Sequence, residues 1–210
     1  MRAARTQKQK SLRHTYVPLL GPNVPKRGNA LSRAIGRSMM KLGGWKFEGS
    51  VPDEPKFVMI VAPHTSNWDF FVGLGALFAL GFRISFLGKH TIFVWPVTPF
   101  LRWLGGIPVQ REVSRDRVAE AVGAFNASEK LLLVLAPEGT RKYVAEWKTG
   151  FYHMADGAHV PIVPVAFDFE NRIIRIHPAF WTTGDRDADI AALQSLYRGV
   201  KGKHPENFAL

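Results

Sequence analysis

The fold is decided by the stretch Phe57-Val58-Met59-Ile60-Val61-Ala62-Pro63-His64-Thr65-Ser66-Asn67-Trp68-Asp69. Its apolar first half predicts a buried strand, and the apolar segment 70–82 that follows it predicts a helix. Polar residues therefore lie in the loop where a buried strand ends. In proteins that alternate strands and helices, ligands and chemistry collect at such loops.

His64 and Asp69 are the two residues of this loop that suggest chemistry. An imidazole exchanges protons near neutral pH and can act as a general base, and a neighbouring carboxylate can hold it in one tautomer. Residues five apart on one helix diverge by roughly 140°, so a contact requires His64 before the helix and Asp69 in its first turn. The alternative is an ordinary loop histidine, followed by an aspartate that the helix dipole favours.

The rest of the chain repeats this alternation of strands and helices. We expect an α/β fold with a mostly parallel central sheet flanked by helices, preceded by a basic amphipathic helix. Strands are predicted at 45–48, 57–62, 83–87, 105–111, 131–135, 160–167 and 172–177, and helices at 30–42, 68–80, 115–127, 147–157 and 190–200. Two prolines in 160–167 favour the edge or the start of a strand. The aromatic segment 93–104 is predicted to be core, with the lining of an apolar pocket as the alternative.

Composition limits the class of protein. The chain of 210 residues is long enough for a sizeable core, and its 46% hydrophobic content excludes wholesale disorder. It has no cysteine, which excludes a thiolate nucleophile, a disulfide framework and cysteine-ligated zinc. We expect a basic, loosely ordered segment over 1–28 and a single domain over 29–210.

The formal net charge of +11 belongs to the N-terminal part of the chain. Residues 1–47 hold eleven Lys or Arg and no acid, whereas seventeen bases balance seventeen acids from Glu48 onward. Such a segment suits a polyanionic partner, either anionic lipid or nucleic acid. The balanced charge of the remainder and the lack of a nucleic-acid-binding motif argue against nucleic acid and favour an anionic membrane surface.

Residues 29–43 predict an amphipathic helix that Asn29 caps. One face of this helix consists of Leu31, Ala34, Ile35, Ser38, Met39 and Leu42, and its basic residues share another face. The helix can lie in a membrane interface or pack its apolar face on the domain, and the sequence leaves both open. No run reaches the ~18 to 20 apolar residues of a membrane span. We therefore expect a peripheral protein on the cytoplasmic face of a membrane, without a transmembrane span.

Two further polar clusters lie at the ends of predicted strands. Arg111 ends a short strand that begins at Gly106, and Glu138-Gly139-Thr140-Arg141 follows the strand 131–135. Arginine grips phosphate with a bidentate fork, and glycine lets the backbone approach a ligand closely. Combined with a base, these groups suit a phosphate-bearing substrate. Each arginine taken alone would be interpreted as a surface residue or a structural ion pair.

Together these residues resemble the PlsC-type glycerolipid acyltransferases, also called 1-acylglycerol-3-phosphate or lysophospholipid acyltransferases. That family has four blocks in order, and residues 45–167 hold a match to each. The matches are His64-x4-Asp69, Gly106-x4-Arg111, Pro137-Glu138-Gly139-Thr140-Arg141 and the Val-Pro strand 160–165, and Lys148 and Gly150 match the Phe-Lys-x-Gly element that follows the third block. The first block departs from the common Asn-His-x-Ser, since Pro63 precedes His64, which weakens the choice of acceptor but not the chemistry.

The resemblance implies an O-acyltransferase of phospholipid biosynthesis or remodelling. It would move a fatty acyl group from acyl-CoA or acyl carrier protein to a hydroxyl of a lysophospholipid such as 1-acylglycerol-3-phosphate. His64 would be the general base and Asp69 its partner, with no covalent intermediate, metal or cofactor. The headgroup of the acceptor would contact Gly106, Arg111, Glu138, Gly139, Thr140 and Arg141.

Some of these residues need their own interpretation. A carboxylate cannot pair with phosphate, so Glu138 is expected to accept from a glycerol hydroxyl or to position Arg111 or Arg141. Ser66, Lys89 and Lys148 are secondary candidates, and Ser66 is interpreted mainly as a loop or cap hydroxyl.

Three alternatives remain open. The acceptor can be a different lysolipid or an aminolipid. A Ser66–His64 hydrolase would release free fatty acid, although the Gly-x-Ser-x-Gly elbow of such enzymes is absent. A non-enzymatic module would use the basic segment to bind a membrane surface.

Overall fold

The computed structural model describes residues 16–109 and 114–210, and within them seven strands form one sheet in the order β1-β7-β6-β2-β5-β3-β4. The strands are β1 (Lys46–Gly49), β2 (Lys56–Ala62), β3 (Ser85–Lys89), β4 (Gly106–Val109), β5 (Leu131–Leu135), β6 (Ile162–Asp168) and β7 (Ile173–Ile176). All neighbours are parallel except β6 and β7. The predicted α/β fold is confirmed, and the loops after β2 and β5 meet at one edge of the sheet.

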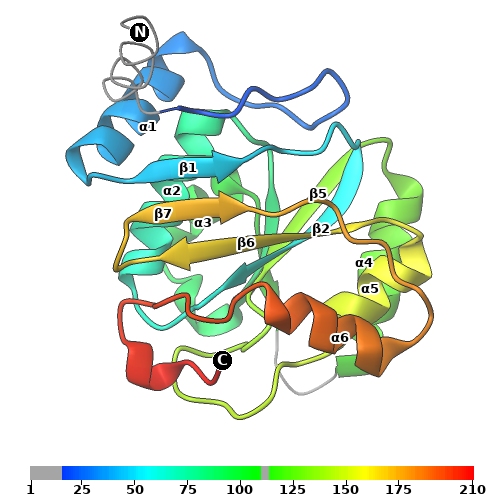
Figure 1. Ribbon diagram of the computed structural model, residues 1–210. Coiled ribbons are helices and arrows are strands. Elements are labelled where there is room, and N and C mark those ends of the chain that lie inside the picture. Colours follow the sequence, from blue (N-terminus) through cyan, green and yellow to red (C-terminus); the bar gives the residue numbers. More distant parts are fainter. Residues whose placement is uncertain (1–15, 110–113) are drawn as a thin grey trace, which may run out of the picture.

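Helices cover both faces of this sheet (Figure 1). They are α1 (Ala30–Leu42), α2 (Trp68–Leu80), α3 (Val97–Leu104), α4 (Ser114–Ala127), α5 (Gly150–Ala158) and α6 (Arg186–Ser195), with the short 3-10 helices η1 (His90–Ile92) and η2 (Pro205–Asn207). One cluster of buried side chains joins α1, α2 and α3 to the sheet, and a second joins α4, α5 and α6 to its other face. We call these the first and second helical layers.

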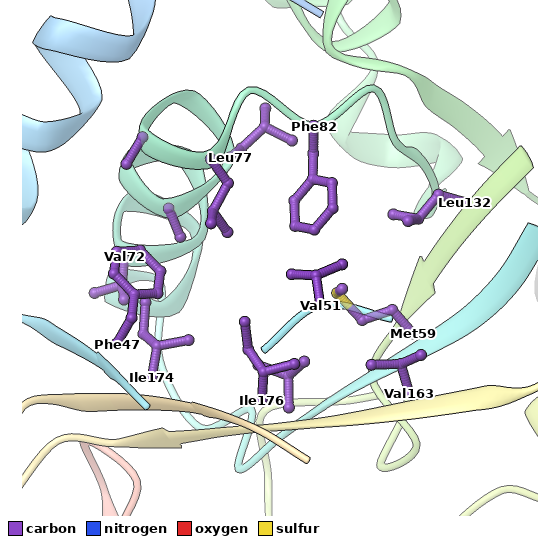
Figure 2. Packing of buried hydrophobic residues seen from close by; sticks show 14 of the residues in the cluster. Phe47, Val51, Met59, Val72, Leu77, Phe82, Leu132, Val163, Ile174 and Ile176 are labelled. Carbon is purple, nitrogen blue, oxygen red and sulfur yellow. The ribbon is translucent and has the colours of Figure 1, made fainter. Parts of the chain in front are cut away.

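The central strand β2 alternates its side chains between the two layers. Phe57 and Met59 pack in the first layer, part of which Figure 2 shows, whereas Val58 and Ile60 pack in the second. Burying side chains of this size stabilises the fold by about 1.5–3 kcal/mol each. Because a slip of one residue would exchange the two sets, the alternation fixes the register of β2 and the position of the loop that follows it.

Strand β6 corrects one sequence-based expectation. Its two prolines favoured an edge or a strand start, yet β6 lies between β7 and β2 and is buried along its whole length. Pro161 precedes the strand, and Pro164 lies where β7 ends. The Pro164 carbonyl still accepts the His177 N–H at 2.9 Å. Proline has no backbone N–H to donate. Pro164 lies at the end of the β6–β7 ladder, so this lack interrupts no hydrogen bond within that ladder.

The N-terminal region is more closely packed than expected. Residues 1–15 lie outside the described part of the chain, but residues 16–28 follow the domain surface. Val24 is 1% exposed, the Arg27 N–H donates to the Gly81 carbonyl at 2.8 Å, and Lys26 forms a bridge with Phe82. The expectation of a loose segment is therefore wrong for these residues, which the end of α2 holds in place.

Helix α1 forms as predicted, with Asn29 and Ser32 capping each other, but its contact face was not predicted. The helix packs on α2 through Gly36 and Met40, where Gly36 lies directly against the α2 backbone. Leu31, Ile35 and Leu42 of the predicted apolar face are 68%, 48% and 88% exposed. The apolar stripe therefore points away from the domain.

Segment 93–104 also differs from the expectation that it is core. Helix α3 turns only Leu101 and Leu104 into the protein. Trp95 is 87% exposed and Trp103 is 53% exposed. The physical reason is position, since α3 precedes β4, which is an edge strand of the sheet.

Candidate active site

The loop between β2 and α2 brings together the predicted catalytic pair. Nδ1 of His64 lies 3.0 Å from Oδ2 of Asp69. The side chain of Asp69 is 2% exposed and that of His64 is 33% exposed, so solvent reaches the ring but not its partner. His64 precedes α2 and Asp69 is in its first turn, as the spacing requires.

Asp69 also closes the loop. Its Oδ2 accepts the Ser66 N–H at 2.8 Å, and the Ser66 hydroxyl accepts the Trp68 N–H at 3.1 Å. Ser66 thus has the loop role expected for its hydroxyl. Because Nδ1 of His64 faces Asp69, Nε2 is the ring nitrogen that remains for a substrate.

Glu138 approaches His64 from the neighbouring strand end. It follows β5 by three residues and is 2% exposed. Its Oε1 accepts the backbone N–H of His64 at 2.8 Å. Burial raises the pKa of Glu138, and the hydrogen bond from His64 offsets part of this effect. The backbone N–H of His64 is thus a partner of Glu138 that was not among those expected from the sequence.

Residues 139–141 of this turn are less buried than Glu138. Gly139 has φ 62°, and a Cβ at this position would lie 2.9 Å from Cδ of Lys148. The conformation of the turn and the Lys148 stem beside it thus both favour glycine here. The Thr140 hydroxyl accepts the Lys142 N–H at 3.4 Å, and Arg141 is exposed.

A hollow of about 360 Å³ opens beside the loops that follow β2 and β5. Its lining consists of Thr65, Ser66, Asn67, Trp68, Arg141 and His204. The His204 N–H donates to the Thr65 hydroxyl at 3.1 Å, across 139 residues of sequence. A Cβ on Gly202 would lie 2.7 Å from the same hydroxyl oxygen. The segment 202–204 is therefore fixed on the His64 loop, which no sequence motif indicated.

Gly106, one of the predicted site residues, is not brought to this hollow. Gly106 is buried at the start of β4, at the level of Met59 in the strand register. That level is three residues before the end of β2, roughly 10 Å along the strand. Gly106 contacts the ring of Phe86, so its small size serves packing. Lys89 is the last residue of β3, and Arg111 lies outside the described residues.

Comparison with known proteins identifies the family. The model of the family described as Acyltransferase matches residues 46–168, more than half of the chain. The chain belongs to the acyltransferase family. The resemblance predicted from the four blocks is thereby confirmed, and the matched span of this acyltransferase contains both loops of the site.

Individual relatives carry more specific names. The 1-acyl-sn-glycerol-3-phosphate acyltransferase of Saccharomyces cerevisiae is 30% identical over 118 residues, which cover 51% of this chain and 37% of the yeast protein. The enzyme of the same name from Haemophilus influenzae is 26% identical over 170 residues, 76% of this chain and 68% of that protein. The chain thus spans well under half of the yeast relative.

A solved structure supports the fold of this acyltransferase. The crystal structure of the 1-acyl-sn-glycerophosphate (LPA) acyltransferase PlsC from Thermotoga maritima superposes with a TM-score of 0.60 at 18% identity. The match covers 81% of this chain and 77% of the other. In the described parts of the present chain, no helix has both the length and the hydropathy of a membrane span.

Proposed function

We propose that this protein transfers a fatty acyl group from an acyl thioester to a hydroxyl of a lysophospholipid. The proposal depends mainly on one observation, the 3.0 Å contact between Nδ1 of His64 and buried Oδ2 of Asp69 in an acyltransferase chain. The names of the relatives support 1-acylglycerol-3-phosphate as the first candidate acceptor. The reaction would serve phospholipid biosynthesis or remodelling.

In this mechanism the acceptor hydroxyl approaches Nε2 of His64. The hydroxyl oxygen attacks the thioester carbonyl carbon while its proton moves to Nε2. The new C–O bond forms, the C–S bond breaks, and the proton then passes to the thiolate that leaves. Asp69 stabilises the imidazolium between these two transfers. No step requires a covalent acyl-enzyme.

Two residues position this chemistry from outside the reacting atoms. Glu138 accepts the backbone N–H of His64 and so holds the residue that carries the base. Arg141 lines the hollow beside the loop, and its guanidinium suits the acceptor phosphate. Arg111 is proposed as a second phosphate ligand on the basis of its place in the second sequence block alone.

Replacement of the base is the direct test. The His64→Ala variant should lose about a thousandfold or more of the initial rate of diacyl product formation, measured by mass spectrometry with one acyl thioester and a panel of lysolipids. His153→Ala removes an exposed histidine of α5 and is the matched control. Equal rates in the His64 variant and the wild type would refute the role of His64. Free fatty acid as the main product would indicate a hydrolase.

We also propose that the outer surface of the first helical layer binds an anionic membrane. The surface includes the exposed stripe of α1 and the exposed aromatic residues Trp68, Phe71, Trp95, Phe100 and Trp103. Indole rings favour the interface between lipid and water, and the basic residues of 1–47 add attraction to anionic headgroups. The base His64 lies just before α2 of the same layer, close to where a lipid acceptor would be.

Two exposed tryptophans allow a matched test of this surface. Trp95, two residues before α3 of the first layer, is 87% exposed, and Trp181, whose neighbour Phe180 packs in the second layer, is 54% exposed. Trp95→Ala should weaken binding to anionic vesicles about tenfold, since an indole contributes a large apolar area. Trp181→Ala should leave vesicle binding unchanged. Equal losses in sedimentation assays would contradict this orientation.

A further inference from the structure

A second hollow, of about 520 Å³, adjoins at Trp68 the hollow that Arg141 lines. Trp68 contributes to both linings. The aromatic part of the second hollow consists of Trp45, Trp68 and Phe169, and the rings of Trp45 and Phe169 meet edge to face at 4.9 Å. The volume is in the range of small-molecule sites, which are typically apolar with a few polar groups.

The rim of this hollow is positive. Arg172, Lys201 and Lys203 contribute three cations, against the single carboxylate of Glu170. Lys201 pairs with Glu170 at 2.7 Å, and the Arg172 guanidinium donates to the Gly43 carbonyl at 3.1 Å. Lys203 is exposed and has no ion pair within the described residues. The aromatic walls and the cationic rim together suit a ligand that combines a flat ring with phosphate groups.

The hollow is held in a fixed position next to the proposed base. Gly202 and Lys203 line it, and the next residue, His204, lines the hollow that contains Arg141. The Thr65 hydroxyl accepts the His204 N–H, and Thr65 is the neighbour of His64 in sequence. One molecule that crosses Trp68 would therefore extend from the cationic rim to the loop of the base.

We infer that this second hollow binds the nucleotide part of an acyl-CoA donor. The inference rests on the proposed acyl transfer and names the donor for it. The adenine ring would pack against the aromatic walls, the phosphates would meet Lys203 and Arg172, and the pantetheine arm would carry the thioester past Trp68 toward His64. An acyl carrier protein presents its thioester on a phosphopantetheine without a base, so it has no use for the aromatic walls.

Direct binding of the probe adenosine 3′,5′-bisphosphate tests this inference without catalysis. Calorimetry should show Lys203→Glu binding it about tenfold more weakly than the wild type, as expected when one charged contact is reversed. Lys203→Arg keeps the cation and should bind as the wild type does. Arg198→Glu makes the same change of charge at an exposed residue outside both hollows and should also bind normally. Equal weakening by Lys203→Glu and Arg198→Glu would overturn the site.

Kinetics with a shortened donor separate this inference from the proposed function. Lys203→Glu should raise the KM for acyl-CoA about tenfold, and the ratio of variant to wild-type KM should fall below about twofold for the acyl-pantetheine thioester. A raised KM for both donors would overturn the inference and leave the transferase intact, as would a wild type that accepts only acyl carrier protein. The absence of transfer from every donor would instead refute the proposed function.

Discussion

Asp69 and Glu138 are two equally buried carboxylates that approach the same histidine from neighbouring strand ends. Asp69 is 3% exposed and Glu138 is 2% exposed. Asp69 meets the imidazole of His64 and one backbone N–H, whereas the hydrogen bonds that Glu138 accepts come from backbone N–H groups, that of His64 among them. The two carboxylates are thus equally buried, and they differ in the groups that they contact.

This difference separates a charge that acts in chemistry from one that acts on geometry. Asp69 has a partner that becomes a cation in the proposed transfer, so its negative charge is stabilised when the base takes up a proton. Glu138 has no cation among its hydrogen-bond partners in the described residues, and burial raises its pKa. We therefore expect the charge of Asp69 to be essential and the charge of Glu138 to be dispensable, provided that its acceptor oxygen remains.

The largest effect should come from Asp69→Asn, which keeps the shape of the side chain and removes its charge. The imidazolium would lose its counter-charge and the ring could adopt the other tautomer, so kcat should fall by roughly 10³–10⁴. Circular dichroism and a thermal melt would check that the variant remains folded. Glu138→Gln is the matched substitution on the other carboxylate and should lose less than about tenfold. Equal losses in the two variants would abolish the distinction.

The pair of Asp69 and His64 was predictable from sequence, but the role of Glu138 was not. Strand β2 and helix α2 each have a clear apolar pattern, so the sequence alone locates the loop between them and its two polar residues. The hydrogen bond between Glu138 and His64 forms because β5 lies beside β2 in the sheet. The order of the elements along the chain does not reveal that these two strands are neighbours. The same holds for His204 on Thr65, which joins the C-terminal segment to the loop.

The errors in the fold have a common cause as well. Segment 93–104 was assigned to the core because it is apolar, yet α3 buries only Leu101 and Leu104. The apolar stripe of α1, for which membrane contact and packing on the domain were both left open, is largely exposed. Helix α1 is attached through Gly36 and Met40, and the close approach at Gly36 leaves no need for the larger apolar residues at the contact. Periodicity thus located these helices correctly and could not tell which face another element covers.

The second effect concerns Glu138 as an acceptor. In Glu138→Ala the His64 N–H would be left without its partner at a part-buried position, and the loop would lose one of its fixed points. We expect kcat to fall by about tenfold to a hundredfold, since small displacements of a catalytic group have effects of this size. Glu138→Gln should restore most of this loss because it retains the carbonyl oxygen. If Gln and Ala are equally impaired, the charge matters and the comparison with Asp69 fails.

The smallest effect should appear in the pH dependence of stability. Because burial raises the pKa of Glu138, the folded protein holds a proton on this carboxyl in a range where the unfolded chain has released it. The folded state then binds more protons than the unfolded state, and stability falls as pH rises from the unfolded pKa to the raised folded pKa. Glu138→Gln lacks this titration.

Urea unfolding at several pH values between about 4 and 8 should therefore show the free energy of unfolding of Glu138→Gln, relative to the wild type, increasing with pH. A difference that stays constant with pH would contradict the raised pKa of Glu138.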